Sequence, residues 1–123
     1  MNNNVFENFK NNNESFALYN ELIKKLDFLP KLTIKKRNSY LKIIVLCNRK
    51  NFACITLLDD NYALIDKGFR IVFHIGEEIK DNRVRTVPEH QPNDFVYYVT
   101  IKTMSDIDIQ LLDWLKQSYD NAK

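Results

Sequence analysis

Hydrophobic positions near the start of the chain follow the period of a helix. The pattern begins at Glu14 and predicts an amphipathic helix, because its apolar residues recur three or four positions apart: Leu18, Tyr19, Leu22, Ile23 and Leu26. Asn13 or Ser15 can cap the N-terminus of this helix. Pro30 ends it, because proline forces the preceding residue out of the helical region.

The middle of the chain changes to the pattern of strands. Tyr40–Cys47 and Phe52–Leu58 are rich in β-branched and aromatic residues, and the polar stretch 48–51 between them predicts a hairpin. Both segments are apolar at consecutive positions, so we expect this pair to lie centrally in a sheet. Further strands are predicted at 62–65, 69–75, 82–87 and 95–101.

Helical spacing returns at the end of the chain. Ser105 can cap a second helix, Asp106 and Asp108 place negative charge in its first turn, and Met104 and Ile109 stand at the positions of a hydrophobic staple. Its apolar face is predicted to hold Ile107, Leu111, Trp114, Leu115 and Ser118. We expect Trp114 and one of Tyr97 and Tyr98 to pack in the core between helix and sheet.

These elements predict an α+β fold, with an antiparallel sheet of about five strands and the N-terminal and C-terminal helices packed on it. The length of 123 residues is typical of one domain, which we place at residues 14–123. Residues 1–13 contain seven asparagines, whose side chains compete for backbone hydrogen bonds. We expect a flexible Asn-rich tail there, held by Phe6 or Phe9.

Charge is distributed unevenly along the chain. The net charge is only +2, yet residues 23–50 hold nine basic residues and one acid, Asp27. Within 31–37, Leu32 and Ile34 are predicted to point inward, while the polar positions between them point outward. The candidate binding surface is Lys31, Lys35, Arg37, Lys42, Arg49 and Lys50. Such a surface can bind phosphate backbones, and it can equally protect an edge strand from aggregation.

One set of residues matches the outline of a metal-dependent nuclease. Asp66, followed by Glu78 and Lys80, supplies two carboxylates and a lysine, but Gly76 interrupts the strand just before the pair. A charged turn between strands is the favoured interpretation.

The two histidines are the remaining candidates for chemistry. His74 or His90, together with Glu78 or Asp94, could serve a small enzyme as general acid or base. Two histidines 16 positions apart make a poor metal site, so we expect no metal and no cofactor.

The cysteines are expected to be structural thiols. A turn centred on Arg49 and Lys50 places Cys47 opposite Phe52 and Cys54 opposite Val45, with the two cysteine Cα atoms about 7–8 Å apart, too far for an unstrained disulfide. Reduced thiols, the lack of a signal-peptide pattern and the lack of a long apolar run lead us to expect a cytoplasmic protein without membrane association.

Several segments together resemble a known family. They are the hairpin sequence Lys50-Asn51-Phe52-Ala53, the strand Phe69–Ile75, and the final helix with Asp108, Asp113-Trp114-Leu115 and Ser118-Tyr119. Over roughly residues 39–122 the chain is similar to a small bacterial domain of unknown function, family five-six-five-five, whose members occur alone or fused to endonuclease-like and predicted transport proteins. The resemblance implies a meander sheet with a packed C-terminal helix, and it implies no activity. Many members carry a glycine-rich stretch where this chain has residues 88–92.

The sequence favours a non-catalytic binding or interaction module over an enzyme. Its basic surface is suited to an anionic partner, either nucleic acid or an acidic protein. The alternatives are the small enzyme described above and a homodimer formed through a sheet edge.

Overall fold

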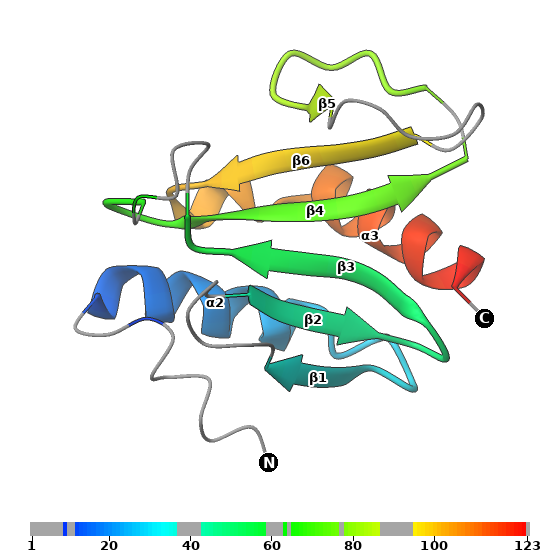
Figure 1. The fold of residues 1–123 in the computed structure, drawn as a ribbon, viewed down its shortest axis with the longest axis horizontal. Helices are drawn as coiled ribbons and strands as arrows, with labels where there is room; N and C mark the ends of the chain where they lie inside the picture. Colours follow the sequence, from blue (N-terminus) through cyan, green and yellow to red (C-terminus); the bar gives the residue numbers. More distant parts are fainter. Residues whose placement is uncertain are drawn as a thin grey trace.

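The computed structural model describes Phe9 and residues 12–36, 43–58, 63, 65–76, 78–86 and 95–122. Its six strands form one antiparallel sheet in the order β1-β2-β3-β4-β6-β5. The two helices lie together on one side of this sheet, behind it in the view of Figure 1. The predicted α+β class is confirmed. The elements are α2 (Asn13–Lys25), β1 (Thr33–Lys36), β2 (Ile43–Cys47), β3 (Asn51–Thr56), β4 (Phe69–Ile75), β5 (Arg85–Thr86), β6 (Phe95–Ile101), the 3₁₀ turn η1 (Met104–Asp106) and α3 (Ile109–Asn121).

The central strands follow the sequence pattern closely. β2 and β3 form the predicted hairpin and lie inside the sheet, between β1 and β4. β4 and β6 have the predicted bounds and pair along all seven residues. β1 is an edge strand among the described elements, and its alternation is as predicted, with Leu32 and Ile34 half-buried and Lys31 and Lys35 exposed.

Two predicted strands differ from the structure. Of the strand expected at 62–65, Ala63 and Ile65 lie in no strand, and the other two residues lie outside the described part of the chain. The strand expected at 82–87 is reduced to Arg85–Thr86, because a turn takes its first residues. In that turn the Asp81 carboxylate accepts a hydrogen bond from the Arg83 N–H at 3.0 Å. Val87 and residues 40–42 lie outside the described residues.

Both helices begin at a different cap from the predicted one. Asn12, not Asn13 or Ser15, caps α2, and its side chain accepts a hydrogen bond from the Ser15 N–H. Asp108, not Ser105, caps α3 through the Leu111 N–H at 3.0 Å. In both cases the cap is the residue whose side-chain oxygen accepts a hydrogen bond from the backbone N–H three positions later. This bond sets the position at which the helix begins.

The expected hydrophobic staple of the last helix is absent for the same reason. Met104 belongs to η1 and not to α3, and the Asp106 carboxylate accepts hydrogen bonds from the Lys102 and Thr103 N–H groups. Met104 is 49% exposed and Ile109 is 85% exposed, so the two side chains do not bury each other.

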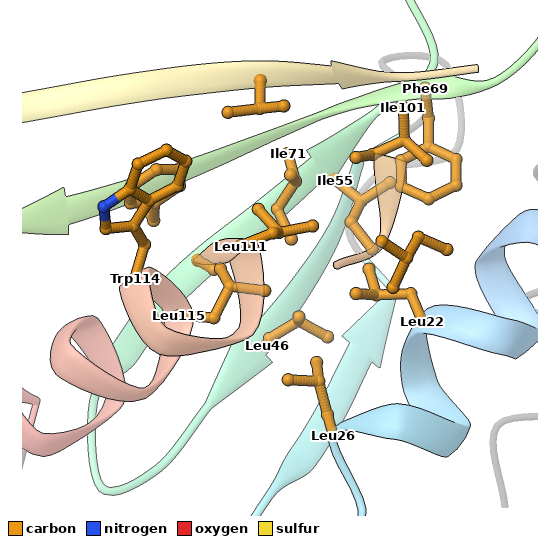
Figure 2. Packing of buried hydrophobic residues seen from close by; sticks show 14 of the residues in the cluster. Leu22, Leu26, Leu46, Ile55, Phe69, Ile71, Ile101, Leu111, Trp114 and Leu115 are labelled. Carbon is orange, nitrogen blue, oxygen red and sulfur yellow. The ribbon is translucent and has the colours of Figure 1, made fainter. Parts of the chain in front are cut away.

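The core lies between the two helices and one face of the sheet. Figure 2 shows Leu22 of α2, Leu26 at its C-cap, and Leu111 and Leu115 of α3 directed at the strands, and all four are fully buried. Burial of each such side chain stabilises the fold by about 1.5–3 kcal/mol. Trp114 stacks on Phe73, with ring centroids 6.1 Å apart, and Tyr97 is buried, as the sequence predicted for Trp114 and one tyrosine.

Phe9 also joins this core, where its ring contacts those of Phe16, Tyr19 and Phe69. Of the two residues expected to hold the N-terminal segment, Phe9 is thus buried in the core, and Phe6 lies outside the described residues. On the opposite face of the sheet, Val45, Cys47 and Val96 are buried as well, although no described helix packs there.

Candidate binding surface

The β2–β3 hairpin is attached to the C-terminal end of α3. The Asn48 side-chain amide donates a hydrogen bond to the Tyr119 carbonyl at 3.2 Å, and the Lys50 N–H donates to the Ala122 carbonyl at 3.1 Å. The Ala122 carbonyl lies past the last N–H of the helix, so its bond to Lys50 satisfies a group that would otherwise need water, whereas the Tyr119 carbonyl also accepts a hydrogen bond from the Ala122 N–H. The bonds of Asn48 and Lys50 fix the backbone of the hairpin tip, while the side chains of Arg49 and Lys50 remain exposed.

The segment before β1 is held to the same helix end. The Lys31 N–H donates a hydrogen bond to the Tyr119 hydroxyl at 2.9 Å. Tyr119 is itself buried, and its ring meets Phe52 edge to face at 5.3 Å. One tyrosine thus joins the start of β1, the hairpin and α3.

A hollow of about 480 Å³ opens between these three segments, and we call it the basic hollow. Phe28, which is 50% exposed, forms part of its wall. The full lining is Phe28, Leu29, Pro30, Lys31, Asn48, Arg49, Lys116, Tyr119 and Asp120.

The lining of the basic hollow carries three basic groups and one acid. The Lys116 ammonium lies 2.8 Å from the Asp120 carboxylate, and this hydrogen bond raises the pKa of Lys116. Both partners are solvent-exposed, so the pair adds little to stability. Lys31 and Arg49 contribute the remaining positive charge.

The structure brings together only part of the predicted basic surface. Lys31 and Arg49 line the basic hollow, whereas Lys50 lines a separate, smaller cavity. Lys35 instead lies on β1, opposite Val45, on the helix-free face of the sheet. Arg37 and Lys42 lie outside the described residues. Lys116 was missed by sequence reasoning, because it belongs to the last helix and not to the basic segment 23–50.

A smaller cavity of about 240 Å³ lies next to Lys50, where β3 and β4 separate. The register of these strands ends at Ala53 and Phe73. Beyond that pair, the Ser118 hydroxyl donates to the Phe52 carbonyl at 2.6 Å and accepts from the His74 N–H at 3.1 Å. The Ser118 hydroxyl therefore bridges the two strands at a point where they are no longer paired directly.

Of the pairs expected for the alternative enzyme, only His74 and Glu78 lie among the described residues, and this smaller cavity does not bring them together. His74 contributes to its lining, but no carboxylate does, and Glu78 is exposed elsewhere. His90 and Asp94 lie outside the described residues.

The nuclease outline is not assembled either. Asp66 precedes β4, whereas Glu78 and Lys80 follow it, so the seven residues of the strand separate them by about 20 Å. Among the residues that the structure describes, no three histidine, cysteine or acidic side chains gather in a metal-binding group. None of its helices is long and apolar enough to cross a membrane.

The hairpin register explains the positions of the cysteines. Cys54 lies opposite Val45, as predicted, but Cys47 lies opposite Asn51 and not Phe52, because the register shifts between Leu46 and Cys47. The Cys47 thiol is buried and donates a hydrogen bond to the Asn51 side-chain oxygen at 3.0 Å. The two cysteines form no disulfide.

Comparison with known proteins gives one match. The sequence model of a family described as "Domain of unknown function (DUF5655)" matches residues 6–122. The chain belongs to the DUF5655 family. No curated protein and no solved structure matches the chain.

The family match is longer than the resemblance seen in the sequence, which began near residue 39. It includes α2, so the N-terminal helix is part of the DUF5655 domain. The sheet of this DUF5655 domain departs from the simple meander that the resemblance implied. The strands β1 to β4 are consecutive, but β6 lies beside β4, and β5 is outermost.

Proposed function

We propose that this DUF5655 domain is a non-catalytic binding module, which holds an anionic partner, either nucleic acid or an acidic protein segment, in the basic hollow. The observation that supports the proposal is the convergence of Lys31, Arg49 and Lys116 on one hollow. These residues come from three separate segments, so their proximity results from the fold and not from local sequence composition.

The hollow is also organised before a partner arrives. The hydrogen bonds of Asn48 and Lys50 to α3 hold the hairpin tip, so less conformational entropy is lost on binding than for a free loop. The exposed ring of Phe28 adds an apolar surface beside the positive charges, against which a base or an apolar side chain can pack.

Fluorescence anisotropy with labelled ligands tests this function. The ligands are a single-stranded oligonucleotide, a duplex of the same length and a polyglutamate peptide, each measured at low and at near-physiological salt. Binding to at least one of them is expected, and it should weaken steeply as salt rises, because neutralised anions release their counterions.

A charge-reversed variant locates the binding. Lys31→Glu, Arg49→Glu and Lys116→Glu together should reduce affinity at least about tenfold, because like charges then face the ligand. The matched control is Lys67→Glu, Lys80→Glu and Lys102→Glu, three exposed lysines that do not line the basic hollow. Each triple variant changes the net charge from +2 by three steps of −2, to −4. Equal losses in both variants would contradict the proposed site.

A further inference from the structure

The helix-free face of the sheet carries one continuous row of residues across all six strands. Successive strand pairings place in register Lys35, Val45, Cys54, Val72, Tyr98 and Arg85. Residues paired in register point to the same side of a sheet. The neighbours of this row along the strands, such as Ile55, Ile71 and Val99, are buried on the helix side. Six strands spaced about 4.8 Å apart give the row a length of about 24 Å.

This row has positive charge at both ends and none of the opposite sign. Lys35 and Arg85 are exposed at its two ends. On this face, the described strand residues include Lys35, Arg70 and Arg85 but no aspartate or glutamate. A strand face that needed only to stay soluble would be expected to carry charges of both signs. This face is complementary to a polyanion.

An aromatic ring and a guanidinium form a layer in the accessible half of the row. The Arg70 guanidinium carbon lies 4.5 Å from the centroid of the Tyr98 ring. Tyr98 and Val72 are half-buried, and the exposed Arg85 pairs with Tyr98 from the far side. Aromatic rings and guanidinium planes are the two protein surfaces on which unpaired bases stack.

We propose that the accessible half of this helix-free face binds single-stranded nucleic acid, with a base stacked on the Arg70–Tyr98 layer and a phosphate beside Arg85. The site is separate from the basic hollow and does not require that the hollow be occupied. A duplex fits it poorly, because its bases are already stacked on one another and are not presented to a sheet. An acidic protein segment would match the charges but would gain nothing from the planar layer.

The experiment compares three single substitutions by anisotropy with a labelled single-stranded oligonucleotide of about a dozen nucleotides. Tyr98→Val keeps a residue suited to a strand but removes the ring, and it should weaken binding roughly 5- to 150-fold. Tyr98→Phe keeps the ring and should bind within about twofold of the wild type. Arg70→Lys keeps the charge but loses the plane, and it should weaken binding several-fold. Circular dichroism and thermal melting verify that each variant is folded.

The outcomes separate this inference from the proposed function. Loss of binding in Tyr98→Val, with retention in Tyr98→Phe, supports the face whether or not the triple variant of the basic hollow also loses binding. Unchanged affinity in Tyr98→Val overturns the face, and so does a duplex that the triple variant of the basic hollow binds as tightly as the single strand. If the hollow variant alone loses binding, the proposed function stands without this inference. If Tyr98→Val weakens the binding of polyglutamate as strongly as that of the oligonucleotide, the face binds protein, and the proposal of a nucleic-acid site is overturned.

Discussion

At the scale of single residues, Tyr19 is under unusual constraint. Its ring is buried against Phe9 and Phe16, and no described group forms a hydrogen bond with its hydroxyl. Burial raises the pKa of Tyr19 to about 12, because the charged phenolate cannot be solvated there. The buried hydroxyl therefore lowers the free energy of unfolding at neutral pH and lowers it further in alkali.

Tyr19→Phe is expected to increase the free energy of unfolding by about 1 kcal/mol at neutral pH, since it removes a buried polar group without a partner. Urea denaturation followed by circular dichroism measures the change. Phe16→Tyr, at a half-buried neighbouring ring, serves as the reverse substitution and should not be stabilising. A Tyr19→Phe protein less stable than the wild type would show that the hydroxyl has a partner after all.

The same residue predicts how stability depends on pH. The pKa in the folded protein, about 12, lies above the ordinary value of 10.0, so the unfolded chain loses its proton first as pH rises. The free energy of unfolding should therefore fall between pH 10 and 12, by roughly 3 kcal/mol in full from this group. Tyr19→Phe should show a shallower decline over that interval in the same urea titrations.

Single residues also show the limit of sequence reasoning. The prediction for Cys54 is confirmed because it depends only on alternation along a strand. The prediction for Cys47 is wrong because the shift between Leu46 and Cys47 changes which residue it faces. Asn48 and Lys50, beside this shift, are bound to α3, and no local pattern records that contact.

At the scale of elements, Ser118 shows how α3 and the sheet depend on each other. Its hydroxyl lies between β3 and β4 and satisfies one backbone group on each strand. The sequence placed Ser118 on the buried face of the helix, and it is 1% exposed. No local pattern explains a polar residue there, because the reason lies in the separation of two strands more than 40 residues away.

Ser118→Ala is expected to lower the free energy of unfolding by about 1–3 kcal/mol, because the Phe52 carbonyl and the His74 N–H lose their partner. Guanidinium denaturation measures it, with Ser105→Ala, an exposed serine, as the matched control near zero. A loss no larger than that of the control would mean that water replaces the hydroxyl at no cost.

The starts of the two helices illustrate what element-level patterns can resolve. Periodicity located both helices and their buried faces, but more than one residue near each start could act as the cap. Ser105, Asp106 and Asp108 all precede the last helix. The structure uses Asp108 as the cap of α3, while Asp106 is the third residue of η1 and accepts a hydrogen bond from the Thr103 N–H. Hydrogen bonds from Arg83 and from the Leu111 N–H outweigh the effect of burial and lower the pKa of Asp108.

At the scale of the whole molecule, strand order could not be read from the chain. Alternation identifies strands and their faces, but it does not say that β5 passes outside β6. Likewise, the basic hollow depends on Lys31 and Lys116, which are separated by most of the sequence. The class of fold could therefore be predicted from the sequence. Of the three basic residues that line the basic hollow, Lys31 and Arg49 were predicted and Lys116 was not.

Strand order predicts how stability is distributed. Amide hydrogen exchange should be slowest in β4 and in the part of β6 that faces it, because β4 is paired on both sides and its inward residues are buried. It should be fastest among the strands in β5, whose two residues are exposed at the edge. Exchange followed by NMR tests the order, and protection in β5 equal to that in β4 would contradict it.

The acid-free strands have a consequence for the speed of encounter with a partner. α3 and its cap carry three acids, Asp108, Asp113 and Asp120, against one base, Lys116, whereas the strands carry only bases. Among these elements the acids thus lie in the layer of α3 and most of the bases lie in the sheet, although the net charge of the molecule is small. An approaching polyanion would exert a torque on it and turn the sheet toward itself before contact, so that fewer collisions are wasted on the wrong orientation.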